Sequence, residues 1–183
     1  LHYAPLSFPK YDWQSGNKNG TFGTAARVAL EWLPFPTKFG KLGLGVESGL
    51  LCFRDVQLPG DMITNFYGIP FGPFASYRMD YFDKQILVPF AKVGLTWVHI
   101  TQSVDVVTAK YRHTKMGQTF NWSVGGELNL NFFEHRAARD LDASTGINAT
   151  YLVVEFMRTE TRLAATEPDL SHDEYRIGLR FEI

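Results

Sequence analysis

The chain has 183 residues and a mass of 20.8 kDa, a length that suits one domain over residues 1–183. Its 18 Lys and Arg residues nearly balance 19 Asp and Glu residues, which argues against nucleic-acid binding by bulk electrostatics. No apolar run in the sequence approaches the roughly 18–20 residues of a membrane-spanning helix. The mean hydropathy of −0.14 is that of a soluble protein, but the aromatic content is high, with 15 Phe, 8 Tyr and 4 Trp.

Apolar and polar residues alternate through most of the chain, and a period of two residues is typical of β-strands. The predicted strands are His2–Tyr11, Thr21–Trp32, Lys41–Glu47, Phe74–Phe82, Ile86–Ile100, Thr119–Phe132, Thr150–Arg158 and Glu174–Ile183. Pro5 and Pro9 confine the first of them to an edge or irregular strand. The pattern predicts about eight antiparallel strands in up-and-down order.

The connections between these strands alternate in length. The short ones are Leu33–Gly40 and Asp83–Gln85, and the long ones are Asp12–Gly20, Asp55–Pro73, Thr101–Gln118 and Thr161–Asp173. The remaining connection contains a predicted short helix over Glu134–Leu141, which ends near Gly146.

The polarity of the two strand faces decides what kind of barrel this is, because soluble and outer-membrane barrels have opposite polarity. The polar face carries many glycines, which suit the crowded interior of a small barrel. It also carries four cationic and four anionic residues, as a mutually neutralised interior would. The predicted interior charge network is Arg27, Glu31, Glu47, Lys92, Glu127, Glu155, Arg176 and Arg180.

These features predict an all-β fold: a closed eight-stranded antiparallel up-and-down transmembrane β-barrel with a short helix in one turn. Aromatic residues toward both strand ends match the interface girdles of membrane barrels. The predicted interfacial aromatics are Trp32, Trp97, Trp122, Phe132, Tyr175 and Phe181. Predicted strand lengths of about 9–12 residues suit a tilted span of the hydrocarbon layer. A soluble lipocalin-like binder is the alternative if the faces are inverted.

Several segments carry a resemblance to a known family. The last strand, Tyr175–Ile183, resembles the C-terminal strand by which outer-membrane barrels are recognised for assembly, with the usual terminal Phe displaced to Phe181. The other segments are Val88–Leu95, Thr119–Ser123, Arg136–Asp142, Thr145–Asn148 and Tyr151–Phe156. Together they are similar to an uncharacterised family of small Gram-negative outer-membrane β-barrel proteins, from about Leu42 to the C-terminus. The resemblance implies eight strands and a helical periplasmic turn, and it implies no activity.

The expected location is therefore the bacterial outer membrane, with both termini periplasmic and export by a signal peptide absent from this chain. The expected partners are outer-membrane lipid, lipopolysaccharide and other outer-membrane or periplasmic proteins, but no nucleic acid. A structural or protein-interaction role is expected, as one component of a larger envelope complex. An eight-stranded interior is just wide enough for side chains to fill it, so a salt-bridged, non-conducting plug is favoured over a narrow channel or proton path.

An outer-membrane enzyme that modifies lipid is the alternative function. Its candidate residues are Ser171, His172 and Asp173 in the fourth long loop, and Ser103 and His113 in the third. Adjacent side chains of an extended chain point to opposite faces, so Ser171 and His172 would not naturally meet, and no catalytic residue is predicted.

No cofactor or metal is expected either, because Cys52 is the single cysteine and the five histidines lack metal-ligand spacing. Asp140 and Asp142 are interpreted as solvated helix charges beside Arg136 and Arg139.

Two of the long loops carry candidate contact residues. The loop over Asp55–Pro73 is unusually apolar, and Phe66, Tyr67 and Phe71 are predicted to dock a protein partner or to cover the barrel mouth. In the next long loop, Lys110, Arg112 and Lys115 are candidates for contact with lipopolysaccharide phosphates. A solvated loop is the alternative for this basic cluster.

Overall fold

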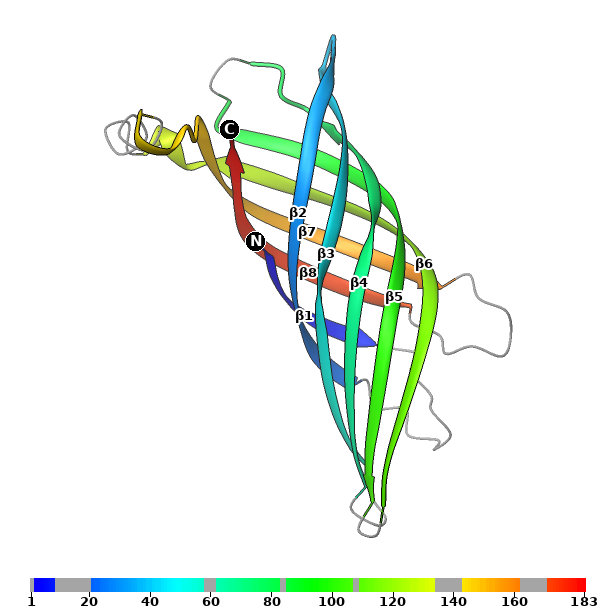
Figure 1. Ribbon diagram of the computed structural model, residues 1–183. Coiled ribbons are helices and arrows are strands. Elements are labelled where there is room, and N and C mark those ends of the chain that lie inside the picture. Colours follow the sequence, from blue (N-terminus) through cyan, green and yellow to red (C-terminus); the bar gives the residue numbers. More distant parts are fainter. Residues whose placement is uncertain are drawn as a thin grey trace.

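The computed structural model describes residues 2–8, 21–57, 62–82, 85–106, 109–133, 143–161 and 171–183 (Figure 1). At 2–8, 21–23, 53–57, 62–66, 102–106, 109–113, 115 and 161 only the backbone is described. The strands are β1 His2–Phe8, β2 Thr21–Thr37, β3 Gly40–Gln57, β4 Met62–Arg78, β5 Leu87–Val106, β6 Ala109–Asn129, β7 Ala149–Thr161 and β8 His172–Glu182. A short 3-10 helix, η1, covers Leu130–Phe132.

Every strand pairs antiparallel with the next strand in the sequence, which confirms the predicted all-β, up-and-down architecture. The strand order is that of a barrel, because β1 pairs with β8 as well as with β2. β1 is short, however, and His2 pairs with Arg27 on one side and with Gly178 on the other. The barrel is therefore joined through β1 along only part of the length of β2 and β8.

Two predicted long loops are wrong, because the strands continue through them. β3 and β4 extend to Gln57 and Met62, where Asp55–Pro73 was expected to be a loop. β5 and β6 extend to Val106 and Ala109, where Thr101–Gln118 was expected to be a loop. In Figure 1 these four strands run well beyond β7 and β8. The apolar alternation that marks a strand in the sequence stops earlier than the backbone hydrogen bonding does.

The connection between β6 and β7 is described only in part. The predicted helix over Glu134–Leu141 lies outside the described residues. Phe132 belongs to η1 and not to a strand, because the Asn129 side chain accepts a hydrogen bond from the Asn131 backbone N–H and caps a helical turn there. Residues 143–145 are helical.

The two faces of the sheet differ sharply in polarity. On the outer face Leu30 and Trp32 are 73% and 71% exposed. On the opposite face Arg78 and Glu174 are fully buried, together with apolar side chains such as Phe90 and Val153. The sheet thus has an apolar exterior and a mixed, charge-bearing interior.

The apolar part of the exterior is shorter than the strands. It runs over Leu42–Leu50 in β3, Tyr67–Tyr77 in β4, Leu87–Trp97 in β5, Phe120–Leu128 in β6 and Tyr175–Ile183 in β8. Each segment has about 9–11 residues, which is the length of a tilted transmembrane strand. Polar outward positions begin beyond it, for example Gln118 in β6 and Arg158 in β7, although Met116 of β6 is also exposed. We call these apolar segments the apolar band.

Candidate functional site: the buried charge network

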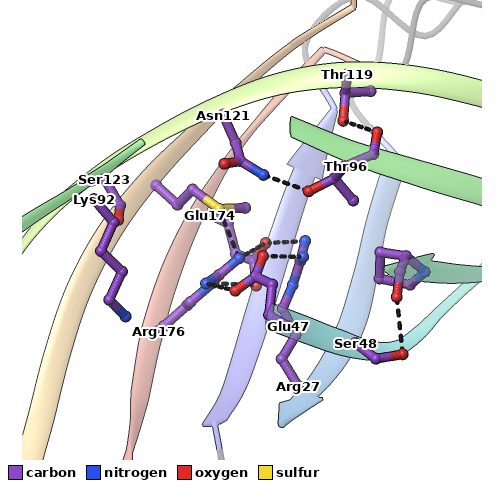
Figure 2. Close-up of polar contacts among 12 residues, drawn as sticks. Arg27, Glu47, Ser48, Lys92, Thr96, Thr119, Asn121, Ser123, Glu174 and Arg176 are labelled. Carbon is purple, nitrogen blue, oxygen red and sulfur yellow. Dashed lines mark hydrogen bonds and ion pairs between the residues drawn. The ribbon is translucent and has the colours of Figure 1, made fainter. Parts of the chain in front are cut away.

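Four charged side chains from three strands meet at the centre of the interior. Arg27 of β2 donates to Glu47 of β3 at 3.0 Å and to Glu174 of β8 at 3.0 Å. Arg176 donates to Glu174 at 2.9 Å and to Glu47 at 3.3 Å. Figure 2 shows the two carboxylates between the two guanidinium groups. Each carboxylate therefore binds both cations.

A third carboxylate extends this group toward β5 and β6. Glu155 of β7 lies 3.4 Å from the Arg176 guanidinium and 3.4 Å from Nζ of Lys92. Ser123 donates its hydroxyl to the same carboxylate at 2.5 Å. The central group thus contains three cations and three anions, so its formal charges cancel.

A second group lies next to it along the interior, toward the β2–β3 turn. Arg78 of β4 donates to Glu127 of β6 at 2.5 Å, and Arg180 of β8 donates to the same carboxylate at 3.0 Å. Arg180 also pairs with Glu31 of β2 at 2.6 Å. Ser76 donates a hydrogen bond to Glu31, and the Arg78 guanidinium stacks 5.2 Å from the Tyr151 ring. Together the two groups link every strand from β2 to β8.

Burial explains why the charges occur as a network and not as isolated groups. The side chains of Glu155, Glu174, Arg78 and Glu127 are at most 1% exposed. An isolated charge at such a site would cost several kcal/mol in lost hydration, and opposite charges with good geometry offset that cost. The chemistry of the site is thus charge compensation on the buried face of the sheet.

All eight residues of the predicted interior network lie in these two groups. Sequence reasoning missed Arg78 and Glu174, which are among the most deeply buried charges. The signal for Glu174 was available, because it lies two positions from Arg176 and residues two apart on a strand share a face. Arg78 was hidden because the short run over Phe74–Phe82 gave only a weak alternation.

The predicted interfacial aromatics lie at or near the ends of the apolar band. Trp32, Phe132, Tyr175 and Phe181 are exposed, and Trp97 and Trp122 are half-buried. Their ring contacts include Phe71 with Trp97 at 5.8 Å, Trp122 with Phe156 at 5.9 Å, Phe132 with Phe133 at 5.8 Å, and Phe156 with Tyr175 at 5.2 Å.

The predicted partner-docking and lipopolysaccharide residues lie in strands and not in free loops. Phe66, Tyr67 and Phe71 belong to β4, and Tyr67 and Phe71 are exposed on the outer face of the sheet. Of Phe66 only the backbone is described. Lys110, Arg112 and Lys115 belong to β6, where their backbones pair with Asp105, Ser103 and Ile100, and their side chains are outside the description. The loop interpretation was wrong because the β4 and β6 backbones are paired with their neighbouring strands through these residues.

The structure describes the side chains of only some of the candidate catalytic residues. His172 is buried, and its Nε2 atom lies 3.6 Å from the Glu174 carboxylate. Asp173, the next residue of β8, is half-buried. Ser171 precedes β8. The side chains of Ser103 and His113 are outside the description, as are Asp140 and Asp142.

Within the described ranges no group of three His, Cys, Asp or Glu residues is arranged to hold a metal ion. No helix in the described part of the chain is long and apolar enough to cross a membrane.

A cavity of about 490 Å³ opens between β2 and β8. It lies between the end of β1 and the β2–β3 turn. Outward-facing Leu30, Trp32 and Phe181 line its outer side, and Lys92 and Glu127 line its inner side. We call it the β2–β8 slot. It passes from the apolar exterior to the charge network.

Two solved structures share this arrangement of strands. The crystal structure of Neisserial surface protein A matches with a TM-score of 0.57 at 13% sequence identity, over 100% of this chain and 93% of that one. The crystal structure of the outer membrane enzyme PagL matches with a TM-score of 0.51 at 14% identity, over 97% of this chain and 95% of that one. The sequence matches no protein-family model and no curated protein. The chain therefore has the fold of small outer-membrane β-barrel proteins.

Proposed function

We propose that the protein is a closed, eight-stranded outer-membrane barrel with a filled, non-conducting interior and a structural or protein-interaction role. The carrying observation is the buried charge network, which crosses the interior from β2 to β8 with its charges largely paired. A conducting pore needs a continuous water path, and guanidinium and carboxylate groups in direct contact fill that path.

The exterior supports a location in the outer membrane. The apolar band is about 9–11 residues long on each of five strands and carries aromatic residues near its ends. Expression with a secretion signal, followed by fractionation, should place the protein in the outer membrane. Unheated samples should migrate differently from boiled samples on gels, as folded barrels do. Recovery in the soluble periplasmic fraction would support the lipocalin-like alternative.

The proposed partners are outer-membrane lipid, lipopolysaccharide and other envelope proteins. Lys110 and Arg112 of β6 lie beyond the apolar band, where phosphate groups of lipopolysaccharide would be within reach of the strand. Co-sedimentation with lipopolysaccharide should weaken in a Lys110→Ala/Arg112→Ala variant and should remain unchanged in Arg158→Ala, whose side chain is half exposed on β7. Equal binding by all three proteins would contradict the lipopolysaccharide contact.

The alternative function is an outer-membrane enzyme that acts on lipid. The fold it shares with the outer membrane enzyme PagL supports this alternative, and so does the contact between His172 and Glu174. Mass spectrometry of lipid A from cells that express the protein tests it. A mass change that is lost in His172→Ala would favour the enzyme, and an unchanged lipid A profile is expected from the proposed structural role.

A further inference from the structure

The first part of β6, from Ala109 to Gln118, pairs with β5 on one side and with no described residue on the other. Pairing between β6 and β7 begins only at Thr119, opposite Thr161. In Figure 1 this end of β6 extends, together with β3–β5, beyond the rest of the sheet. The first part of β6 is thus an edge strand, on which another extended chain can pair.

The connection from β7 to β8 is too short to cover this edge. Nine residues separate Thr161 from Ser171 in the sequence, and β8 begins at His172, opposite Thr159. A segment of that length, leaving the sheet and returning to it at this level, can follow β6 over about four positions. It would end beside Lys115, so the edge before that residue is beyond its reach.

One hydrogen bond shows which backbone groups of β6 point to the open side. The Asn129 N–H donates to the carbonyl of Ile86, the residue before β5, at 2.8 Å. Successive residues of an antiparallel strand point their N–H and C=O groups to alternate sides, and the β5–β6 register is unbroken from Ala109 to Leu128. Odd-numbered residues of β6 therefore bond to β5, and even-numbered residues point away from it. On the open side these are Lys110, Arg112, Thr114, Met116 and Gln118.

This edge lies beyond the apolar band, where water can hydrate its open groups. The band on β6 begins at Phe120, and the side chains of Thr114 and Gln118 are exposed. Unpaired backbone N–H and C=O groups are costly in hydrocarbon, where no water can bond to them. Outside the hydrocarbon layer the edge can stay open in the folded barrel until a partner strand displaces the water.

The charge of the edge strand selects the charge of a partner. From Ala109 to Gln118 the sequence has no acidic residue and three cationic ones, Lys110, Arg112 and Lys115. The stretch of β5 that pairs with it, Trp97–Val106, contributes one acidic residue, Asp105, opposite Lys110. Opposite charges on neighbouring strands stabilise pairing, and like charges oppose it. A strand that pairs with this edge should therefore be acidic.

We propose that this edge of β6 binds an acidic, extended segment of a partner protein, which adds to the sheet as a further strand. The inference rests on the proposed protein-interaction role and names the site and the partner class for it. Main-chain hydrogen bonds to the even-numbered residues supply affinity, and acidic residues at alternate positions match Lys110 and Arg112. A second copy of the chain is a poor occupant, because two basic β6 strands repel each other.

The binding test uses the full chain, refolded in detergent micelles and shown to be folded by its heat-dependent migration on gels. The probe is a fluorescent peptide of about ten residues, the length of the open edge, that alternates Glu and Thr. Its controls alternate Glu with Pro, which cannot pair as a strand, or Lys with Thr. Fluorescence anisotropy should show that both controls bind at least about tenfold more weakly.

Two outcomes of this measurement would overturn the proposal. Equal binding of the Glu–Thr and Glu–Pro peptides would show charge attraction alone, as contact with lipopolysaccharide phosphates would use. No binding of the Glu–Thr peptide to the folded barrel would show that the edge does not accept an acidic strand.

Thr114 offers a matched pair of variants. Thr114→Pro removes an N–H that points to the open side and removes no hydrogen bond to β5, so the barrel should still fold. It should weaken binding of the Glu–Thr peptide about tenfold or more, whereas Thr114→Ala should bind within about twofold of the natural sequence. Equal binding by the two variants would contradict strand addition.

Amide hydrogen exchange, followed by NMR, tests the edge without any substitution. In the free protein the amides of Lys110, Arg112 and Thr114 should exchange fast, whereas those of Tyr111 and His113 should exchange slowly because they bond to β5. The Glu–Thr peptide should slow the first set at least about tenfold and leave the second set unchanged. Slow exchange of the first set without peptide would show that the edge is already covered, and would overturn the proposal. Loss of heat-dependent migration, in contrast, would contradict the barrel itself.

Discussion

Arg180 on β8 and Glu31 on β2 form a 2.6 Å ion pair across the slot, where β1 no longer separates the two strands. The same Arg180 guanidinium donates to Glu127 on β6 at 3.0 Å. One side chain therefore ties the last strand to two others beside the slot.

Replacement of Arg180 by Met should destabilise the barrel strongly. The change leaves two poorly hydrated carboxylates, Glu31 and Glu127, without this cation, and breaking a buried ion pair typically costs about 3–5 kcal/mol. Urea unfolding from lipid vesicles, followed by tryptophan fluorescence, measures the change. The matched control is Arg158→Met, which removes a half-exposed pair with Glu160 and should cost less than about 1 kcal/mol. Equal losses in the two variants would contradict a buried network.

Arg27 and Glu174 should be energetically coupled. They contact each other directly at 3.0 Å, and each is almost completely buried. In a double-mutant cycle with Arg27→Met and Glu174→Gln, the second change should cost less once the first is made. The expected interaction energy is about 0.5–3 kcal/mol from the same unfolding assay. Additive effects would mean that the two groups do not stabilise each other in the folded protein.

A charge on the apolar band should be costly according to its depth. Val46 lies near the middle of the band on β3 and is exposed, so Val46→Arg should lose about 2–4 kcal/mol of stability in a bilayer. Thr114 on β6 is also exposed but lies beyond the band, so Thr114→Arg should change stability by about 0–1 kcal/mol. A similar loss in both variants would place the membrane elsewhere on the strands.

Gly72 should resist substitution because another strand approaches it closely. A Cβ atom at this position would collide with the Leu95 carbonyl of β5, so Gly72→Ala must displace backbone and should cost about 1–3 kcal/mol. At Gly126 the nearest atom to an added Cβ is Leu87 Cδ1 at 3.5 Å, an ordinary contact. Gly126→Ala should therefore fold with nearly unchanged yield in a vesicle-refolding assay, and a reversed order of the two variants would contradict the β4–β5 packing.

Most of the fold inside the apolar band, apart from Tyr67–Pro73 of β4, could be predicted from the sequence, because there the two faces of each strand differ in hydrophobicity. The inward positions of Arg27, Lys92 and Arg180 could be anticipated for the same reason. Beyond the band both faces can be polar, so the alternation disappears although hydrogen bonding continues through Gln57 and Ala109. Lys110 lies in such a polar stretch, whereas Phe66 lies in a segment whose apolar residues do not alternate.

Which cation meets which carboxylate could not be predicted, because it depends on register. The network forms where tilted strands bring distant residues together, as with Arg27 and Glu174, which are 147 positions apart. Register in turn depends on turn geometry and on the shear of the barrel. The slot likewise follows from the register of β1 against β2 and β8, which alternation within one strand does not reveal.

Planar-bilayer recording of the purified, refolded protein is the most direct test of the filled interior. We expect no stable conductance steps from the natural sequence. We expect steps to appear in a variant with Arg27→Ala, Glu47→Ala and Arg176→Ala, which removes three of the six charged side chains of the central group. Steady single-channel conductance from the natural sequence, at the level of that variant, would contradict a charge-filled, non-conducting barrel.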